Sequence, residues 1–91
     1  DTTKMSISDE PLVISINESG KYFLNLGEEQ LPISLLELKN KAKIIYQANP
    51  DIEIVFKSDA NVPFNFVAKG MASIQSLGIE KIGIVTSGYD N

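Results

Sequence analysis

The sequence predicts a single α+β domain, a two-layer sandwich in which one mixed β-sheet packs against two helices on one face. Three observations lead to this fold class. The 91-residue chain has the length of one small domain. Its 43% hydrophobic and 22% charged residues are typical of a globular protein. Short runs with the two-residue period of strands alternate with longer runs of helical period, in the order β-β-α-β-α-β.

The first third of the chain predicts a β-hairpin that follows a polar arm. We expect residues 1–11 to form the arm. Residues 12–17 and 22–26 both alternate in polarity, as half-buried strands do. The segment 18–21 between them is a turn in which Gly20 can adopt a positive φ. The side chains expected to face the core are those of Leu12, Ile14, Ile16, Tyr22, Leu24 and Leu26.

Residues 34–49 predict the first helix. Ser34 and Glu37 have the spacing of a capping box, which satisfies two backbone N–H groups at the helix start. Pro50 disfavours helical geometry at the residue before it and therefore ends the helix. A very short strand is expected at residues 30–33. The apolar stripe expected to face the sheet consists of Leu35, Leu38, Ala42 and Ile45.

The second half of the chain predicts a strand at residues 52–58, a helix at 62–77 and a last strand at 81–86. Asn61 is the expected N-cap of this helix. Gly70 lies inside it and lowers its stability, so we expect the helix backbone to approach the sheet closely there. The buried stripe is expected to contain Val67, Met71, Ile74 and Leu77, and Gly78 is the expected stop.

The topology follows from these elements. Strands 52–57 and 81–86 flank a helix and should be parallel, and right-handed crossovers place both helices on the same sheet face. The opposite face and the edge strands are left for a partner. We expect one strand of the hairpin, 12–17 or 22–26, to offer a free edge. Either an added peptide strand or a second copy of the chain could pair there, with Tyr22 and Leu24 as contact residues.

Composition excludes several functions. The net charge of −4, with eight lysines and no arginine, argues against binding to nucleic acid or anionic lipid. The absence of His and Cys removes zinc–thiolate sites and thiol nucleophiles, and the serines lack a base. Asp51, Glu53 and Asp59 do not have the spacing of a Ca²⁺ loop. We therefore expect no enzyme activity, no metal and no cofactor.

A second candidate contact region is the loop before the second helix. It contains Asp59, Asn61, Pro63 and Phe64. Polar loop groups beside an aromatic ring suit recognition of a partner. The alternative is structural: the loop makes the turn, a side chain caps the helix, and Phe64 packs the helix start onto the core.

Two segments of the sequence resemble the periplasmic domains of the ExbD/TolR family. They are residues 54–64, IVFKSDANVPF, and residues 77–86, LGIEKIGIVT. The order of elements is similar to that of the family over residues 11–87. One departure is Phe64, which stands where the family usually has Tyr. This resemblance implies a domain at residues 12–87 and a short tail at 88–91.

The resemblance also implies a setting for the domain. It implies a protein held at the periplasmic face of the bacterial inner membrane by one N-terminal helix, which carries the proton-carrying Asp outside this fragment. The implied partners are a TolQ/ExbB-like channel and a TolA/TonB-like transducer. No apolar run here approaches the roughly 20 residues that span a bilayer, and the chain begins at Asp1, so we expect a fragment of the longer protein.

The resemblance leaves two functions open. A TolR-like domain would belong to a Tol-Pal type system driven by the proton-motive force. It would bind peptidoglycan or partner proteins, as a homodimer, and maintain outer-membrane integrity. An ExbD-like domain would instead bind an extended transducer peptide and serve nutrient transport across the outer membrane. The lysines of the first helix, Lys39, Lys41 and Lys43, are a solvated surface or a weak contact for anionic cell-wall polymer.

Overall fold

The predicted order of elements is confirmed in the computed structural model, which describes residues 10–26 and 31–87. The elements are β1 Leu12–Ile16, β2 Tyr22–Leu24, α2 Leu35–Ala48, β3 Ile54–Asp59, α3 Phe64–Gln75 and β4 Ile82–Ser87. Most of the expected arm and all of the expected tail lie outside the described residues.

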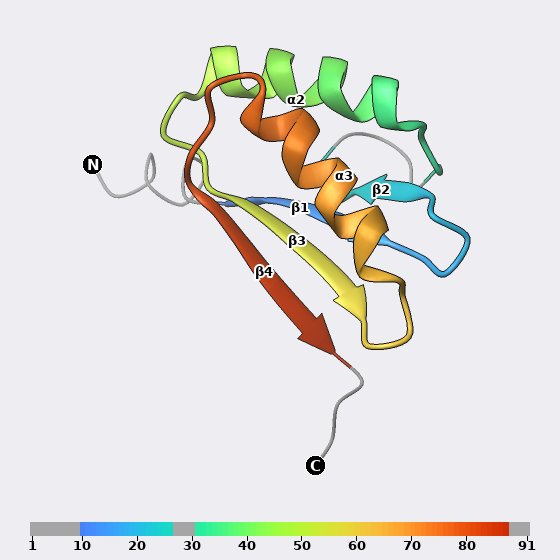
Figure 1. The fold of residues 1–91 in the computed structure, drawn as a ribbon. Coiled ribbons are helices and arrows are strands. Elements are labelled where there is room, and N and C mark those ends of the chain that lie inside the picture. Colours follow the sequence, from blue (N-terminus) through green and yellow to red (C-terminus); the bar gives the residue numbers. More distant parts are fainter. Residues whose placement is uncertain (1–9, 27–30, 88–91) are drawn as a thin grey trace.

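The four strands form one mixed sheet in the order β2-β1-β3-β4. The pair β1–β2 is antiparallel, while β1–β3 and β3–β4 are parallel. Figure 1 shows α2 and α3 on the same side of this sheet. No helix of the described residues covers the other side, so the predicted two-layer arrangement is confirmed. We call the two sides of the sheet the helix-covered face and the open face.

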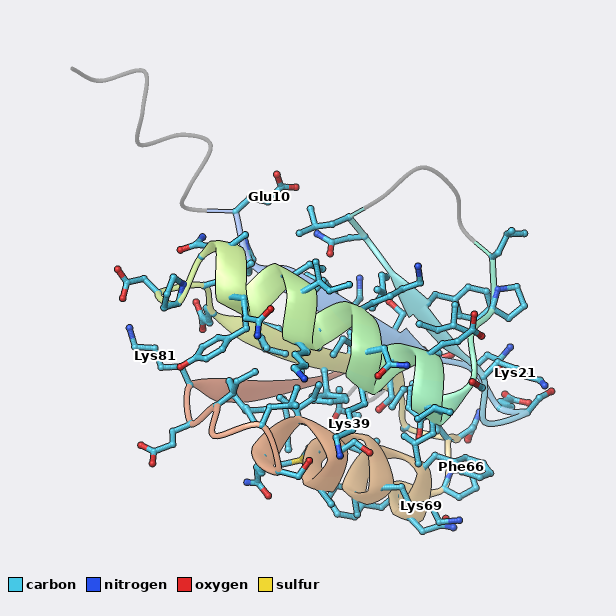
Figure 2. All side chains as sticks on the ribbon, turned by 90° about the horizontal axis from the view of Figure 1, so that it is seen from above. Glu10, Lys21, Lys39, Phe66, Lys69 and Lys81 are labelled. Carbon is cyan, nitrogen blue, oxygen red and sulfur yellow. The ribbon has the colours of Figure 1, made fainter. Side chains whose placement is uncertain are left out.

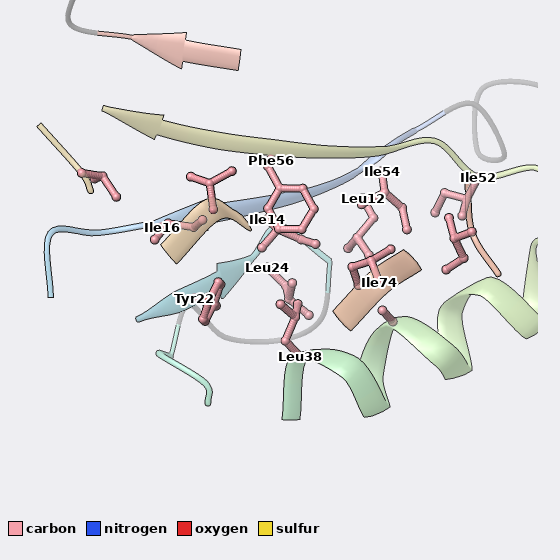
Figure 3. Close-up of a cluster of buried hydrophobic side chains, with 14 residues drawn as sticks. Leu12, Ile14, Ile16, Tyr22, Leu24, Leu38, Ile52, Ile54, Phe56 and Ile74 are labelled. Carbon is pink, nitrogen blue, oxygen red and sulfur yellow. The ribbon is translucent and has the colours of Figure 1, made fainter. Parts of the chain in front are cut away.

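The hydrophobic core lies between the helix-covered face and the two helices. Alternate residues of the strands point toward the helices because successive side chains of a strand lie on opposite faces. Figure 3 shows these side chains meeting residues of α2 and α3. The fully buried members are Leu12, Ile14, Ile54 and Phe56 from the strands and Leu38, Ala42 and Ile74 from the helices. The core-facing residues predicted for β1 and β2 are therefore correct.

The capping box predicted for the first helix is present. The Ser34 hydroxyl accepts a hydrogen bond from the Glu37 N–H at 3.2 Å, and the Glu37 carboxylate accepts one from the Ser34 N–H at 3.1 Å. Asn49, which precedes Pro50, has φ −145° and is no longer helical. The helix thus begins and ends where its local chemistry predicts.

The second helix differs from expectation at its start. It begins at Phe64, its N-cap is Pro63, and no side chain caps it, so Asn61 as N-cap was wrong. The reason is a turn before the proline, in which the Val62 N–H donates to the Asp59 carbonyl at 3.1 Å. Pro63 then has an extended ψ of 132°, and the helix can begin only after it.

Two glycines of the fold behave as predicted. Gly20 has φ +85° in the hairpin turn. Gly70 lies where α3 crosses the sheet, and a Cβ placed there would be 2.7 Å from Phe56 Cε2 and 3.1 Å from Tyr22 Cε2. The close approach of helix to sheet therefore requires glycine at position 70.

Candidate interaction surface

The hairpin end of the sheet is less open than the sequence suggested. β1 pairs with β2 on one side and with β3 on the other, so it offers no edge. β2 is the edge strand, but Ile33 bridges to it: the Ile33 N–H donates to the Tyr22 carbonyl at 2.8 Å. The expected short strand at residues 30–33 is thus an isolated bridge at Ile33, and Gln30 lies outside the described residues.

Tyr22 and Leu24, proposed above as contact residues, turn their side chains into the core. They are only 4% and 8% exposed. The Tyr22 hydroxyl donates to the Phe66 carbonyl at 2.8 Å and thereby ties β2 to the first turn of α3. Burial raises the pKa of the Tyr22 phenol above its usual value. The side chains of Tyr22 and Leu24 are therefore not available to a partner.

The loop between β3 and α3 brings the other four predicted contact residues together at the surface. Asp59, Asn61, Pro63 and Phe64 are all exposed, and Phe64 is 64% exposed. The expectation that Phe64 packs the helix start onto the core is therefore wrong. Phe66 does this instead: a Cβ at Gly20 would lie 2.9 Å from its ring, so the ring covers the hairpin turn. Figure 2 shows Phe66 at the same end of the molecule as Lys21 of that turn.

The other edge of the sheet is β4, which the sequence reasoning did not single out. Figure 1 shows it as the outermost strand, and none of the described residues pairs with its outer side. Its branched side chains are exposed, Ile84 to 44% and Val85 to 50%. β4 contains neither proline nor a charged residue, which are the usual devices that protect a sheet edge.

The hydrogen-bonding pattern shows which groups β4 turns outward. The Ile54 N–H donates to the Lys81 carbonyl at 3.1 Å, which fixes the phase of the parallel ladder. Residues of β4 then alternate between bonding β3 and facing outward. Gly83 and Val85 bond β3, whereas Ile84 and Thr86 turn their N–H and C=O groups toward the outer edge. The Ile82 N–H is already used, because it donates to the Glu80 carbonyl at 3.0 Å.

The open face beside this edge is partly apolar. Register places Phe23, Ser15, Lys57 and Val85 in one row across the sheet. The next row contains Val13, Val55 and Gly83. Near the ends of β1 and β3 the face carries a shallow hollow lined by residues that include Phe23, Lys57 and Asp59. A β-branched run with one glycine, IGIVT, was the available sequence signal for this surface.

The described residues offer little for chemistry. Within residues 10–26 and 31–87, no three His, Cys, Asp or Glu side chains gather where they could hold a metal ion. In the same part of the chain, no helix has the length and hydropathy needed to cross a bilayer. What the described surface does offer is an unpaired strand edge, a partly apolar sheet face and a loop with an exposed aromatic ring.

The fold and this surface define a class of protein: a small α+β domain with one open sheet face and one unpaired edge strand, the geometry used for strand addition. The chain belongs to the ExbD/TolR family, because a family model described as "Biopolymer transport protein ExbD/TolR" matches residues 1–88. The family resemblance drawn from the sequence is therefore confirmed.

Individual relatives carry the name biopolymer transport protein ExbD. One from Pseudomonas aeruginosa is 33% identical over 78 residues, which cover 86% of this chain and 56% of the relative. One from Neisseria gonorrhoeae is 26% identical over 77 residues, which cover 85% of this chain and 53% of the relative. The chain thus spans about half the length of these relatives.

Proposed function

We propose that this chain is the non-catalytic partner-binding domain of an ExbD-like biopolymer transport protein. In this proposal it binds an extended segment of an energy-transducing partner, which adds as a fifth strand to the outer edge of β4. The observation that carries the proposal is that edge, with its outward backbone groups and exposed Ile84 and Val85. The ExbD names of two relatives are in line with an ExbD-like role.

The physical basis is the same as that of any sheet extension. The backbone N–H and C=O groups of Ile84 and Thr86 point outward and would bond the added strand, which gives affinity without a sequence requirement. Side chains of the added strand would alternate between the two faces of the sheet. One set would lie beside Ile84 on the α3 side, and the other beside Val85 on the open face.

The family supplies the setting of this proposal. A full-length protein anchored in the inner membrane would hold the domain in the periplasm, next to an ExbB-like channel. A TonB-like transducer that crosses the periplasm would provide the extended segment. The domain would then contribute binding rather than chemistry to the coupling of the proton-motive force to transport.

The test uses a variant that removes one outward donor. Ile84→Pro deletes an N–H that faces the edge and leaves the bonds to β3 intact, which is where proline is tolerated in sheets. Ile84→Val retains the N–H and is the matched control. The recombinant periplasmic region of a TonB-like transducer is titrated into the ¹⁵N-labelled chain. We expect amide shifts along β4 and an affinity loss of about tenfold or more for Ile84→Pro only.

Two results would contradict strand addition at β4. The first is a set of shifts confined to residues 59–64 with β4 unmoved. The second is equal binding by Ile84→Pro and Ile84→Val, each checked for a dispersed amide spectrum. Sedimentation of the free chain across a concentration series shows in parallel whether a homodimer occupies the edge.

A TolR-like domain that binds peptidoglycan is the second candidate. It is favoured by the loop at residues 59–64, where the Phe64 ring and the Asn61 amide are both exposed. An exposed ring beside an amide offers one apolar and one hydrogen-bonding surface to a glycan. Purified sacculi should retain the folded chain at low salt and release Phe64→Ala. Absence of any retention of the native chain would remove this candidate.

A further inference from the structure

Gly83, in the middle of β4, is not required by the fold of its own chain. Its register with Val55 continues on both sides without a bulge. Among the described residues, the glycines with positive φ are Gly20 and Gly78, and Gly83 is not one of them. A Cβ placed on Gly83 would meet no described atom within 4 Å. A glycine inside a strand lowers stability, and it often marks a place where another molecule approaches closely.

The missing Cβ leaves a notch on the open face. Val55 borders it on β3, and Val85 lies two residues along β4 on the same face. The other glycine inside a regular element, Gly70, shows what fills such a notch: the ring of Phe56 lies 2.7 Å from its ideal Cβ position. No described residue plays this part for Gly83.

The position of Gly83 on the edge suits a ring from an added strand. Its own backbone groups bond β3, so an antiparallel neighbour would meet it in a pair without hydrogen bonds. Side chains are closest in such pairs. An aromatic ring placed across from an edge glycine covers the exposed backbone and is a recognised way to stabilise glycine in sheets.

The charge of Lys57 predicts a second feature of the added strand, an acidic side chain. Lys57 is exposed on the open face, in register with Val85. A strand added beyond β4 would lie two strand spacings, about 10 Å, from β3. Lys57 on β3 and a carboxylate on the added strand are both long enough to meet above Val85, which lies between them on β4. The strand position beside Val85 is two residues from the one beside Gly83.

We propose that β4 selects extended segments that carry an aromatic residue, seated over Gly83, and an acidic residue two positions away, within reach of Lys57. This inference rests on the proposed strand addition and specifies the partner sequence. The pattern places both side chains on the open face, because residues two apart in a strand share a face.

The probes are three blocked synthetic peptides with the sequences TVTFTETVT, TVTATETVT and TVTFTKTVT. Each is titrated into the ¹⁵N-labelled chain, and affinities come from the β4 amide shifts. The first should bind about tenfold more tightly than the second, since a buried ring is lost. It should bind about twofold to fivefold more tightly than the third, because an exposed ion pair contributes little.

Variants of the chain assign these preferences to residues. Gly83→Val fills the notch and should abolish the advantage of the aromatic over the alanine peptide. Gly83→Ala should reduce it in part. Lys57→Glu should reverse the preference between the acidic and the lysine peptide while leaving the aromatic preference intact. Dispersed amide spectra and an unfolding transition confirm that each variant is folded.

The outcomes separate this inference from the function on which it rests. If the three peptides shift β4 equally, the selectivity is overturned and strand addition stands. If neither the peptides nor the transducer region shifts β4, both are overturned. If β4 amides move on dilution, or when residues 1–9 are removed, a second copy or the chain's own arm occupies the edge and the inference is overturned. Preferences unchanged by Gly83→Val would also overturn it.

Discussion

Gly70 and Gly83 lie on opposite sides of the sheet and differ in what surrounds them. On the helix-covered face, the ring of Phe56 and the edge of Tyr22 occupy the space where a side chain of Gly70 would be. On the open face, the corresponding space at Gly83 is empty of described residues. The first glycine is required by packing within the chain. The second lowers stability, and no described residue compensates for it, which is the observation behind the proposed contact with a partner.

The two faces of the sheet differ in packing in the same way as the two glycines. On β1, β2 and β3 the helix-covered face consists mainly of large branched and aromatic side chains that are buried, whereas Ile84 at the β4 edge of this face is exposed. The open face carries side chains that are half-buried or exposed, and apart from Phe23 they are smaller or polar: Val13, Ser15, Val55, Lys57 and Val85. Free energy of folding should therefore concentrate on one side of the sheet, and the other side is free to serve binding.

Truncation of neighbouring residues on β3 should give the largest contrast. Phe56→Ala removes a fully buried ring and should lower the free energy of unfolding by about 3–5 kcal/mol. Val55→Ala, the adjacent residue on the open face, should lower it by about 1 kcal/mol or less. Urea denaturation followed by circular dichroism measures both. Equal losses would mean that the open face is also part of a core in solution.

Filling the covered notch should give the next largest effect. Gly70→Ala gains about 1 kcal/mol of helix propensity. Its Cβ would lie 2.7 Å from a carbon of Phe56, a residue with no free space to move into. Such overpacking costs about 1–3 kcal/mol, so we expect a net loss of up to about 2 kcal/mol. Thermal unfolding measures it, and a gain in stability would contradict the close packing of α3 on β3.

The bond between Tyr22 and α3 should contribute less. Tyr22→Phe removes the 2.8 Å hydrogen bond to the Phe66 carbonyl and should cost about 1 kcal/mol. Burial raises the pKa of this phenol, so the folded state holds its proton longer than the unfolded state. The resulting stabilisation is complete below about pH 10 and is lost as pH rises through the folded-state pKa.

Measuring the free energy of unfolding from neutral to alkaline pH tests whether stability is lost as predicted. The native chain should lose more stability above about pH 10 than Tyr22→Phe does. Tyr46→Phe is the matched control, because Tyr46 is less buried and packs at the margin of the core. An identical alkaline loss in the native chain and in Tyr22→Phe would show that Tyr22 does not carry the effect.

The sequence determined most of the fold because its local signals agree. The capping box at Ser34, the stop at Pro50 and the alternation in each strand all act within a few residues. The N-cap of the second helix was mispredicted because two signals compete there. Asn61 favours capping, but Pro63 fixes an extended segment and the helix begins after it.

The candidate site was harder to predict because it depends on strand order. Knowing where the strands lie in the sequence does not tell which strand lies at an edge of the sheet. The free edge was expected at one strand of the hairpin. The parallel pairing of β1 with β3 makes β1 internal and leaves β4 outermost. Likewise, Phe64 and Phe66 are two residues apart in sequence, yet only the structure shows that Phe66 is partly buried against the hairpin turn while Phe64 is exposed.

The smallest expected effect is a gain in stability, and it tests the comparison of Gly83 with Gly70 most directly. Gly83→Ala adds a methyl group to open space and reduces the freedom of the unfolded chain. It should therefore raise the free energy of unfolding by about 0.5–1 kcal/mol, whereas Gly70→Ala lowers it. Measuring both variants in the same urea series removes errors common to the two. A loss of stability for Gly83→Ala would mean that something already fills the notch in the free protein, and the two glycines would then serve the same purpose.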